Sequence, residues 1–310
     1  MTSQIEQRVS SKIRRTFRDG EAVYEKEYVV NDWDNDAAVI HCRARREVEL
    51  LLQVSTSNQF GGRLGVVRIA NADPDAGTIA TFEIAGTSLG EFVLEGDDVA
   101  TNLTPWFLAG RWLRQFQTLP LVCQTSVSLS KNDPVDIVDY CNLRLCSLAD
   151  YGYAWPSETT RKALLQTVEC LRSRCQSKSM NRVWVHADYS PGNLMWDGRV
   201  LTPIDFAMVR AGTPLEDATY LIHRIEMQRI YRPWLRLPGA AIRQAILRGL
   251  GVRTADQSAA YQMLMLKHQI CRLHTYSRRP AKSLKQSLHD RWVRTMLRRR
   301  LLQAVKNTLK

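Results

Sequence analysis

Two stretches near the start of the chain alternate between hydrophobic and polar positions, the period of half-buried β-strands. The segment KIRRTFRDGEAVYEKEYVV predicts two strands around an Asp-Gly turn, which is a common hairpin signal. The segment RLGVVRIANADPDAGTIATFEI predicts a second hairpin with a Pro- and Gly-containing loop. Between them, an acidic loop, NDWDNDAA, leads into HCRARREVELLLQV, whose apolar residues recur at helical spacing until about Ser55.

Helical patterns dominate the chain after Gly86. The segments TPWFLAGRWLRQFQTL and SETTRKALLQTVECLRSRC are amphipathic, and nearly everything from Asp217 to Lys310 has helical spacing. Short strand-like runs interrupt the helices in VWVHADYSPGNLMWDGRVLTPIDF. The pattern predicts an α+β, two-lobed plan. A small antiparallel β-rich lobe with one helix covers residues 1–86, and a large, mainly helical lobe covers residues 87–310.

Composition narrows the class of protein. No apolar run reaches the roughly 18 residues needed to span a bilayer. The N-terminal segment MTSQIEQRVSSK lacks the apolar stretch of a secretion signal. The seven cysteines form no CxxC pair, so reduced thiols are expected. We therefore expect a cytoplasmic protein.

The net charge of +12 is concentrated at the C-terminal end, where residues 278–310 hold eleven Lys or Arg and one acidic residue, Asp290. The segment LHDRWVRTMLRRRLLQAVKNTLK predicts an amphipathic helix. Its apolar stripe and surrounding basic residues are Val293, Leu297, Leu301, Val305 and Leu309, and Arg291, Arg294, Arg298, Arg299 and Lys306. Two interpretations stay open: a terminal helix packed on the large lobe, or a basic face against an anionic membrane at its inner surface. Nucleic acid is less favoured, because no aromatic-basic interleaving supports base recognition.

The strand-like segment 183–206 carries an unusual set of polar residues. Asp188 and Asn193 flank a tight loop, YSPG, and an Asp-Gly turn after Trp196 predicts a hairpin that returns Asp205 to the side of Asn193. Asn193 and Asp205 offer hard oxygen ligands for a Mg²⁺ that carries a polyphosphate. Asp188 would then be free to accept a proton from a hydroxyl, the division of roles that phosphoryl transfer needs.

These residues resemble a known family. HADYSPGNLMW followed by TPIDF is similar to the HGDxHxxN…IDF signature of the aminoglycoside and choline phosphotransferases, which are relatives of protein kinases. The resemblance implies a kinase-like fold, ATP and Mg²⁺ as cofactors, Asp188 as catalytic base, and Asn193 and Asp205 as metal ligands. It also implies that His186 is structural. Downstream, GTPLEDATYL resembles the family's G-x-P-x-x-D-L-A segment, with matches at Gly212, Pro214 and Asp217.

The resemblance also implies positions in the small lobe. FEIAGTSL resembles the hinge of the family, so the backbone between Phe82 and Ala85, which includes Ile84, is expected to bind adenine. The family pairs a strand Lys on the nucleotide phosphates with a helix Glu. Lys26 is the best candidate, with Glu47 as its partner and Glu49 as the second choice, although Lys26 could also be a solvated strand charge.

Three departures from the family pattern leave the activity open. RVSSKIRR offers serines where a Gly-rich phosphate loop is expected, and Ala187 and Ala207 replace usual glycines. A pseudokinase or binding module is therefore the alternative to an active enzyme. The phosphate loop GxxxxGK[ST] is absent from the sequence, which argues against P-loop ATPases.

Charge also bears on the acceptor. Arg210, Arg224 and Arg229 follow Asp205, so the large lobe favours a neutral or anionic sugar over a cationic aminoglycoside. We expect a small molecule, a sugar, or a sugar on a lipid or glycan carrier to receive the phosphate. Sugar kinases that act on the lipopolysaccharide core share the two-lobed plan. The sequence does not indicate an oligomeric state.

Overall fold

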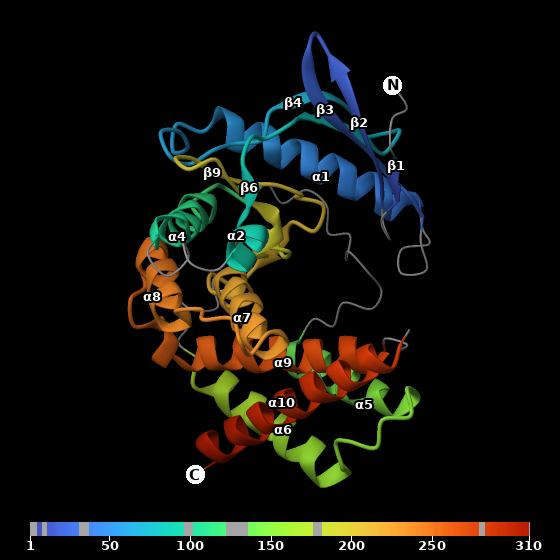
Figure 1. Cartoon of the computed structure of the whole chain (residues 1–310), viewed down its shortest axis with the longest axis vertical. Coiled ribbons are helices and arrows are strands. Elements are labelled where there is room, and N and C mark those ends of the chain that lie inside the picture. Colours follow the sequence, from blue (N-terminus) through green and yellow to red (C-terminus); the bar gives the residue numbers. More distant parts are fainter. Residues whose placement is uncertain are drawn as a thin grey trace.

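The computed structural model describes residues 5–7, 11–30, 37–95, 102–121, 136–175, 182–278 and 283–309. A twisted sheet and one long helix lie at one end of the molecule, and the other end is built mainly from helices (Figure 1). Two predicted features, the acidic loop at 31–36 and the serine-containing turn at 8–10, lie outside the described residues.

The N-terminal sheet is antiparallel in the order β1-β2-β3-β5-β4. Its strands are β1 (Ile5–Gln7), β2 (Ser11–Arg18), β3 (Glu21–Tyr28), β4 (Ile69–Asp73) and β5 (Thr78–Phe82). Asp19 and Gly20 both have positive φ, as a two-residue hairpin turn requires. Helix α1 (Ala37–Thr56) packs along the sheet (Figure 1). Both predicted hairpins and the predicted helix are present.

The chain leaves the sheet through residues 83–86 and enters β6 (Thr87–Ser88), which pairs with β8 (Leu194–Trp196) of the helical part. Gly86 has a φ of 108°, and a Cβ there would lie 2.3 Å from the Trp196 carbonyl oxygen, so only glycine fits. A second connection joins Gly65 N to the Leu201 carbonyl at 2.7 Å. The sheet and the helical part are therefore also linked through backbone hydrogen bonds, and the domain boundary after residue 86 stays a prediction.

Helices form most of the remaining chain. They are α2 (Leu89–Glu95), α4 (Thr104–Phe116), α5 (Ile137–Asp150), α6 (Glu158–Ser173), α7 (Glu216–Tyr231), α8 (Gly239–Leu250), α9 (Ala259–Arg278) and α10 (Leu284–Thr308), with short turns η2 (Pro191–Asn193) and η3 (Ala255–Gln257). The predicted helices are confirmed, whereas α2 and α5 were not predicted. Helix α5 had a readable signal, since the Asp136 side chain accepts from Val138 N as an N-cap.

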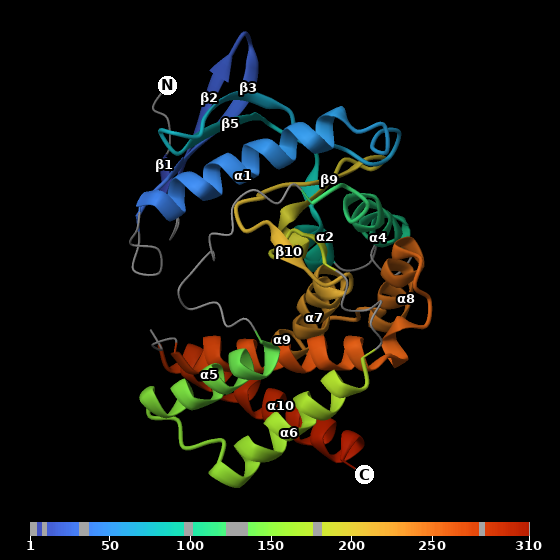
Figure 2. The ribbon, with the colours of Figure 1, turned by 180° about the vertical axis from the view of Figure 1, so that it is seen from behind.

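Packing divides the interior into two hydrophobic clusters. The larger one runs from Tyr28 and Leu50 in the N-terminal part to Trp112 and Ile246 in the helical part. Helices α4 and α8 approach so closely at Gly110 that a Cβ there would lie 2.0 Å from the Ile246 carbonyl oxygen. Only glycine fits at this position. The second cluster joins α5, α6, α9 and α10 at the far end (Figure 2). The site described below lies on the first cluster, which joins both lobes.

The basic C-terminal helix is present as α10. Val293, Leu297 and Leu301 of the predicted stripe are buried, whereas Leu309 is 41% exposed. Part of its basic face contacts the protein: Arg294 donates to the Tyr276 carbonyl at 3.1 Å, and Arg298 lies 4.4 Å from the Tyr153 ring centre. Within the described residues, no helix is long and apolar enough to cross a membrane.

Candidate active site

A buried histidine begins the loop that carries most of the candidate chemistry. Strand β7 (Val183–Val185) pairs with β10 (Arg210–Gly212) and delivers His186 into the interior. The His186 ring packs 4.6 Å from Phe206, and its Nε2 lies 3.0 Å from the Ile204 carbonyl oxygen. Burial lowers the pKa of His186 to about 4, so the neutral ring donates to that carbonyl. His186 thus fixes the loop, as a structural residue.

Asp217, at the start of α7, holds the same loop through two hydrogen bonds. Its two carboxylate oxygens accept the backbone N–H groups of His186 at 2.7 Å and Ala187 at 2.9 Å. Ala187 has a φ of 63°, the left-handed region where the small residue that replaces glycine is tolerated. Burial raises the pKa of Asp217 to about 7, against the effect of the two N–H donors. The loop geometry therefore depends on a side chain 30 residues further along the chain.

Asp188 follows in this loop with its carboxylate held by two donors. Asn193 Nδ2 donates to Asp188 Oδ2 at 3.0 Å, and the Tyr220 hydroxyl donates to Oδ1 at 3.1 Å. Burial raises the pKa of Asp188, while these two hydrogen bonds favour its ionised form. Tyr220 was missed by the sequence reasoning. Its signal is the spacing of three residues from Asp217 on α7, which places both on one side of the helix.

The predicted hairpin returns Asp205 to the neighbourhood of Asn193. Strand β8 pairs with β9 (Leu201–Pro203), and Ile204 N donates to the Asn193 carbonyl at 2.9 Å. Asp205 has a φ of 64°, which is uncommon for a non-glycine residue and typical of functional sites. The structure thus brings Asn193, Asp205 and Asp188 to one place.

Lys26 reaches this place from the sheet. Its Nζ lies 2.6 Å from Asp205 Oδ1 and 3.3 Å from Glu47 Oε2. Burial by itself lowers the pKa of Lys26, but the carboxylates of Glu47 and Asp205 outweigh it and raise the pKa well above its usual value. The lysine is therefore charged, and it is not the solvated strand charge of the alternative interpretation.

Glu47 is the centre of a buried network on α1. Its Oε1 accepts from Phe206 N at 3.0 Å, and its Oε2 accepts from the Tyr28 hydroxyl and from Lys26. Glu49, the second choice for the lysine partner, is exposed. The network thus connects the sheet, α1 and the segment after β9 across both lobes.

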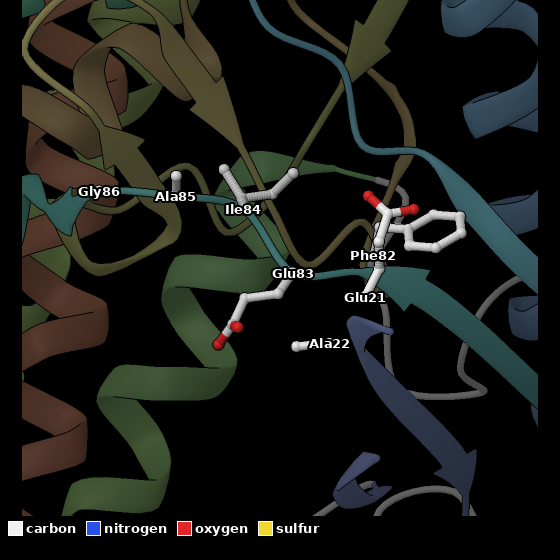
Figure 3. Close-up of a pocket in the computed structure, with 7 residues that line it drawn as sticks. All are labelled: Glu21, Ala22, Phe82, Glu83, Ile84, Ala85 and Gly86. Carbon is white, nitrogen blue, oxygen red and sulfur yellow. The ribbon is translucent and has the colours of Figure 1, made fainter. Parts of the chain in front are cut away.

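The hinge segment lines a cavity of about 360 Å³ (Figure 3), a volume within the range of ligand pockets. Its lining residues are Glu21, Ala22, Phe82, Glu83, Ile84, Ala85 and Gly86. The Phe82 ring lies under Arg68, whose guanidinium carbon is 4.2 Å from the ring centre. The sheet register places Phe82 three residues from Ile79, the partner of Lys26, so Phe82 and Lys26 point to opposite faces. The Phe82 ring therefore faces away from Lys26, which is not among the residues that line the cavity.

Two N–H groups of the hinge backbone are candidates to donate hydrogen bonds to a ligand. The N–H groups of Phe82 and Glu83 already donate to the Arg68 and Ala22 carbonyls at 3.0 and 2.9 Å. The N–H groups of Ile84 and Ala85 make no backbone hydrogen bond to any residue that the structure describes. Nucleotide binding at Phe82, Ile84 and Ala85 stays a prediction, and Ile84 and Ala85 are the more suitable donors.

An ion pair that sequence reasoning missed fixes the hinge to the sheet. Arg15 donates to both Glu83 oxygens at 3.1 and 2.7 Å, and the Tyr24 hydroxyl donates to Oε1 at 3.0 Å. Figure 3 shows the Glu83 side chain directed away from Phe82. Tyr24 lies two residues before Lys26, so both side chains lie on the same face of the sheet.

The side chains at this site fit Mg²⁺ only if water and phosphates supply its remaining ligands. No group of three or more His, Cys, Asp or Glu side chains with metal-ligand proximity occurs among the described residues. The Asn193 amide nitrogen is used by Asp188, which leaves its oxygen as a ligand beside the Asp205 carboxylate. Two protein oxygens suit an ion that takes its other ligands from water and phosphates.

The three arginines after Asp205 have different environments. Arg210 pairs with Glu216 at 2.5 Å. Arg229 is exposed at the end of α7. Arg224 is partly buried one helical turn after Tyr220 and acts electrostatically on Asp188. Of the three, Arg224 is the one beside the candidate base.

A sheet lobe with a Lys–Glu pair, a hinge, and a helical lobe with an Asp–Asn loop followed by a strand and a second Asp define the protein-kinase-like fold. The comparisons with known proteins agree. A model of the "Phosphotransferase enzyme family" (APH) matches residues 138–263. That range contains Asp188, Asn193, Asp205 and Asp217 but not Lys26 or Glu47. No curated protein matches the chain by sequence.

Solved structures resemble the whole chain. The ADP-bound aminoglycoside phosphotransferase APH(2'')-Ib has a TM-score of 0.56 at 13% identity, over 95% of this chain and 93% of that chain. A choline/ethanolamine kinase family protein from Mesorhizobium loti has a TM-score of 0.60 at 12% identity, over 98% and 92%. An ethanolamine kinase from Plasmodium vivax has a TM-score of 0.61 at 10% identity, over 96% and 82%. The predicted fold and the resemblance to the phosphotransferase family are confirmed.

Proposed function

We propose that the protein is a kinase that transfers a phosphoryl group from ATP, as its Mg²⁺ complex, to a hydroxyl of a small molecule or sugar. One observation carries the proposal. Lys26 of the sheet lobe meets Asp205 of the helical lobe at 2.6 Å, and the loop that carries Asp188 is joined to the same segment through Asn193. The family match and the kinase-like neighbours support it, since ADP or ATP is named in some of those structures.

Asp188 has the role of base in this proposal. Its carboxylate would accept the proton of the acceptor hydroxyl, and the donors Asn193 and Tyr220 would hold it in one orientation. Burial raises the pKa of Asp188, and the hydrogen bonds from Tyr220 and Asn193 to the charged form oppose that effect. Tyr220 is a positioning residue that acts through Asp188.

Lys26, Asp205 and Asn193 have the role of holding the nucleotide phosphates. Bound Mg²⁺ would neutralise charge on the phosphates, with the Asn193 and Asp205 oxygens as its protein ligands. Lys26 would exchange part of its contact with Asp205 for a phosphate oxygen, while Glu47 keeps it oriented. The N–H groups of Ile84 and Ala85 would bind the adenine edge. Most of the catalytic effect would come from positioning and charge neutralisation.

Thermal stabilisation tests the nucleotide site. A ligand that binds the native state raises its stability by RT ln(1 + [L]/Kd), so millimolar ATP reveals even a weak site. We expect ATP with Mg²⁺ to raise the melting temperature of the wild type, and EDTA or Asp205→Ala to remove that rise. Asp75→Ala, at an 83% exposed carboxylate, is the control and should keep the rise. A wild type that ATP and Mg²⁺ leave unchanged would instead favour the pseudokinase alternative.

We further propose that the acceptor is a sugar on a lipid or glycan carrier and that α10 lies against an anionic membrane. At 100° per residue, the exposed Leu284, Leu288, Trp292 and Leu302 fall within about 80° of one another on α10, opposite the buried stripe. Arg291, Arg299 and Lys306 are exposed in the same sector. Apolar side chains interspersed with cations suit a helix that lies in the interface of an anionic bilayer.

Vesicle sedimentation tests this surface. The protein should bind vesicles with 30% phosphatidylserine and leave vesicles of phosphatidylcholine alone, because each basic residue near an anionic surface adds about 1 kcal/mol. The double variant Leu284→Ser with Leu288→Ser should reduce binding about tenfold. Phe17→Ser, at a 61% exposed site on the sheet lobe, is the matched control. Equal binding to both vesicle types, or binding to DNA instead, would contradict the membrane proposal.

A further inference from the structure

Arg224 lies beside the candidate base with no acidic partner. It follows Tyr220 by one turn of α7, and Tyr220 donates to Asp188. Arg224 favours the ionised forms of Asp188 and Tyr220 electrostatically, which places its charge near both groups. Among the residues that the structure describes, none forms a hydrogen bond or ion pair with the Arg224 guanidinium. A partly buried cation of this kind has unused capacity to bind an anion.

A second cation without an acidic partner, Arg144, is connected to Tyr220 by side chains of α7, α9 and α5, which form one wall. Tyr220 packs 5.4 Å from His268 on α9, and Cys271, one turn further, contacts the Tyr140 hydroxyl of α5 at 3.3 Å. Arg144 lies 5.1 Å from the Tyr140 ring centre. Within the described parts of the chain, its guanidinium forms no ion pair with a carboxylate. Side-chain contacts thus lead from Asp188 to His268 on α9, and from Cys271, one turn along α9, to Tyr140 and Arg144.

The remaining charges of this wall are already neutralised. Lys267 Nζ lies 5.4 Å from the centre of the Tyr140 ring and pairs with Glu216 at 2.7 Å. Glu216 also pairs with Arg210 at 2.5 Å, and these cations lower the pKa of Glu216 far below its usual value despite burial. Since Glu216 binds two cations at once, the wall has a net positive charge. A cationic acceptor would meet repulsion there, whereas an anion would meet two arginines.

We propose that the acceptor carries an anionic group, a phosphate or a carboxylate, which Arg224 and Arg144 bind while its hydroxyl lies at Asp188. This inference rests on the proposed kinase function and adds the chemical class of the acceptor. Arginine suits the role because its planar guanidinium binds phosphate or carboxylate through two parallel hydrogen bonds. The acceptor would thus be recognised by its charge at a fixed separation from the hydroxyl that is phosphorylated.

Binding to the nucleotide-loaded protein tests the proposal without knowledge of the natural acceptor. Glucose 6-phosphate, glucuronate, glucose and glucosamine are titrated into protein with Mg²⁺ and a non-hydrolysable ATP analogue, by calorimetry. We expect millimolar or tighter binding of one or both anionic probes, at least tenfold tighter than the neutral and cationic ones. The phosphate and uronate arms decide which anion is preferred. No preference for an anion would overturn the proposal.

Variants assign the effect to the two arginines. Arg224→Gln and Arg144→Gln should each weaken the anionic probe about tenfold or more and leave glucose unchanged. Arg229→Gln, on the same helix but exposed, should behave as wild type. Equal binding in Arg224→Gln and Arg229→Gln would overturn the assignment. So would a loss of nucleotide binding in Arg224→Gln, since Arg224 would then bind the nucleotide phosphates.

The failure of this inference can be told from the failure of the proposed function. The Mg²⁺-dependent stabilisation by ATP and slow hydrolysis of ATP in water need no sugar acceptor. If both are present and anions are not preferred, only the acceptor class is wrong. If both are absent, the kinase function itself is wrong.

Discussion

Lys26 and Arg224 face the candidate site from opposite lobes, and their surroundings differ. The Lys26 side chain is 13% exposed and lies between two carboxylates, Glu47 and Asp205. Arg224 lies near one carboxylate, Asp188, whose oxygens are already used by Asn193 and Tyr220. A cation held by internal carboxylates has a fixed position before any ligand arrives. A cation without such partners is available for a ligand that the chain does not supply.

This difference separates two kinds of expected defect. Removal of a carboxylate beside Lys26 leaves a buried charge with one partner fewer, which costs stability as well as nucleotide binding. Removal of Arg224 breaks no ion pair, so the main cost should appear in acceptor binding. The variants below test this distinction in order of decreasing effect.

Asp188→Asn changes the candidate base. We expect turnover to fall by about 10²- to 10⁴-fold, because an amide cannot accept the proton, while nucleotide binding is retained. Turnover is measured by ADP release with a saturating acceptor, and nucleotide binding by the Mg²⁺-dependent thermal shift. Asp139→Asn, at an exposed position on α5, is the control. Unchanged turnover would remove Asp188 from the mechanism.

Glu47→Gln should break the network around Lys26. We expect a loss of about 3–5 kcal/mol in the free energy of unfolding, the usual cost of removing one partner of a buried ion pair, together with weaker nucleotide binding. Urea unfolding measures the first quantity and calorimetry the second. Glu49→Gln, two residues along the same helix and exposed, should change neither. Equal effects of the two substitutions would mean that the buried network contributes little.

Glu216→Gln tests the neutralised part of the Arg224 wall through pH. The folded pKa of Glu216 lies far below its unfolded value of about 4.5. Its stabilising effect is therefore fully present above pH 5 and is lost as pH falls from about 4.5 toward the folded pKa. The difference in unfolding free energy between wild type and Glu216→Gln should be smaller at pH 3.5 than at pH 5.5.

The opposite pH dependence of Glu216→Gln would contradict this prediction. A difference that grows as the pH falls would mean that the folded pKa is raised, and the two cations would not dominate the surroundings of Glu216. The same variant should bind the anionic probe more tightly than wild type, since it removes a negative charge beside Lys267.

We expect the smallest effect from Arg298→Ala, on α10, where a packed and an exposed arginine are neighbours. Arg298 lies over the rings of Tyr153 and Trp155, at 4.4 and 5.3 Å, whereas Arg299 is exposed. We expect Arg298→Ala to lower the unfolding free energy by about 0.5–1 kcal/mol and Arg299→Ala to leave it unchanged. Arg299→Ala should instead weaken binding to anionic vesicles. A reversed result would exchange the roles of the two arginines.

The sequence by itself determined the features that depend on neighbouring residues. The Asp19-Gly20 turn, the hairpin around Asp197-Gly198 and the amphipathic helices α1, α4, α6 and α10 follow from period and turn chemistry, because the relevant interactions span a few residues. The loop from His186 to Asn193 was readable for the same reason, and its polar residues indicated the class of chemistry.

Only the tertiary structure decided which of several equivalent side chains belong to the site. Lys26 and Asp205 are 179 residues apart in sequence and lie 2.6 Å apart in space. The sequence ranked Glu47 ahead of Glu49, but nothing local distinguishes Arg224 from Arg229 or Arg298 from Arg299. The packing of α1 on the sheet, and of α7 against α9, fixes which face of each helix is covered. Since a helix turns 100° per residue, a shift of one or two positions moves a charge from solvent into contact with other parts of the protein.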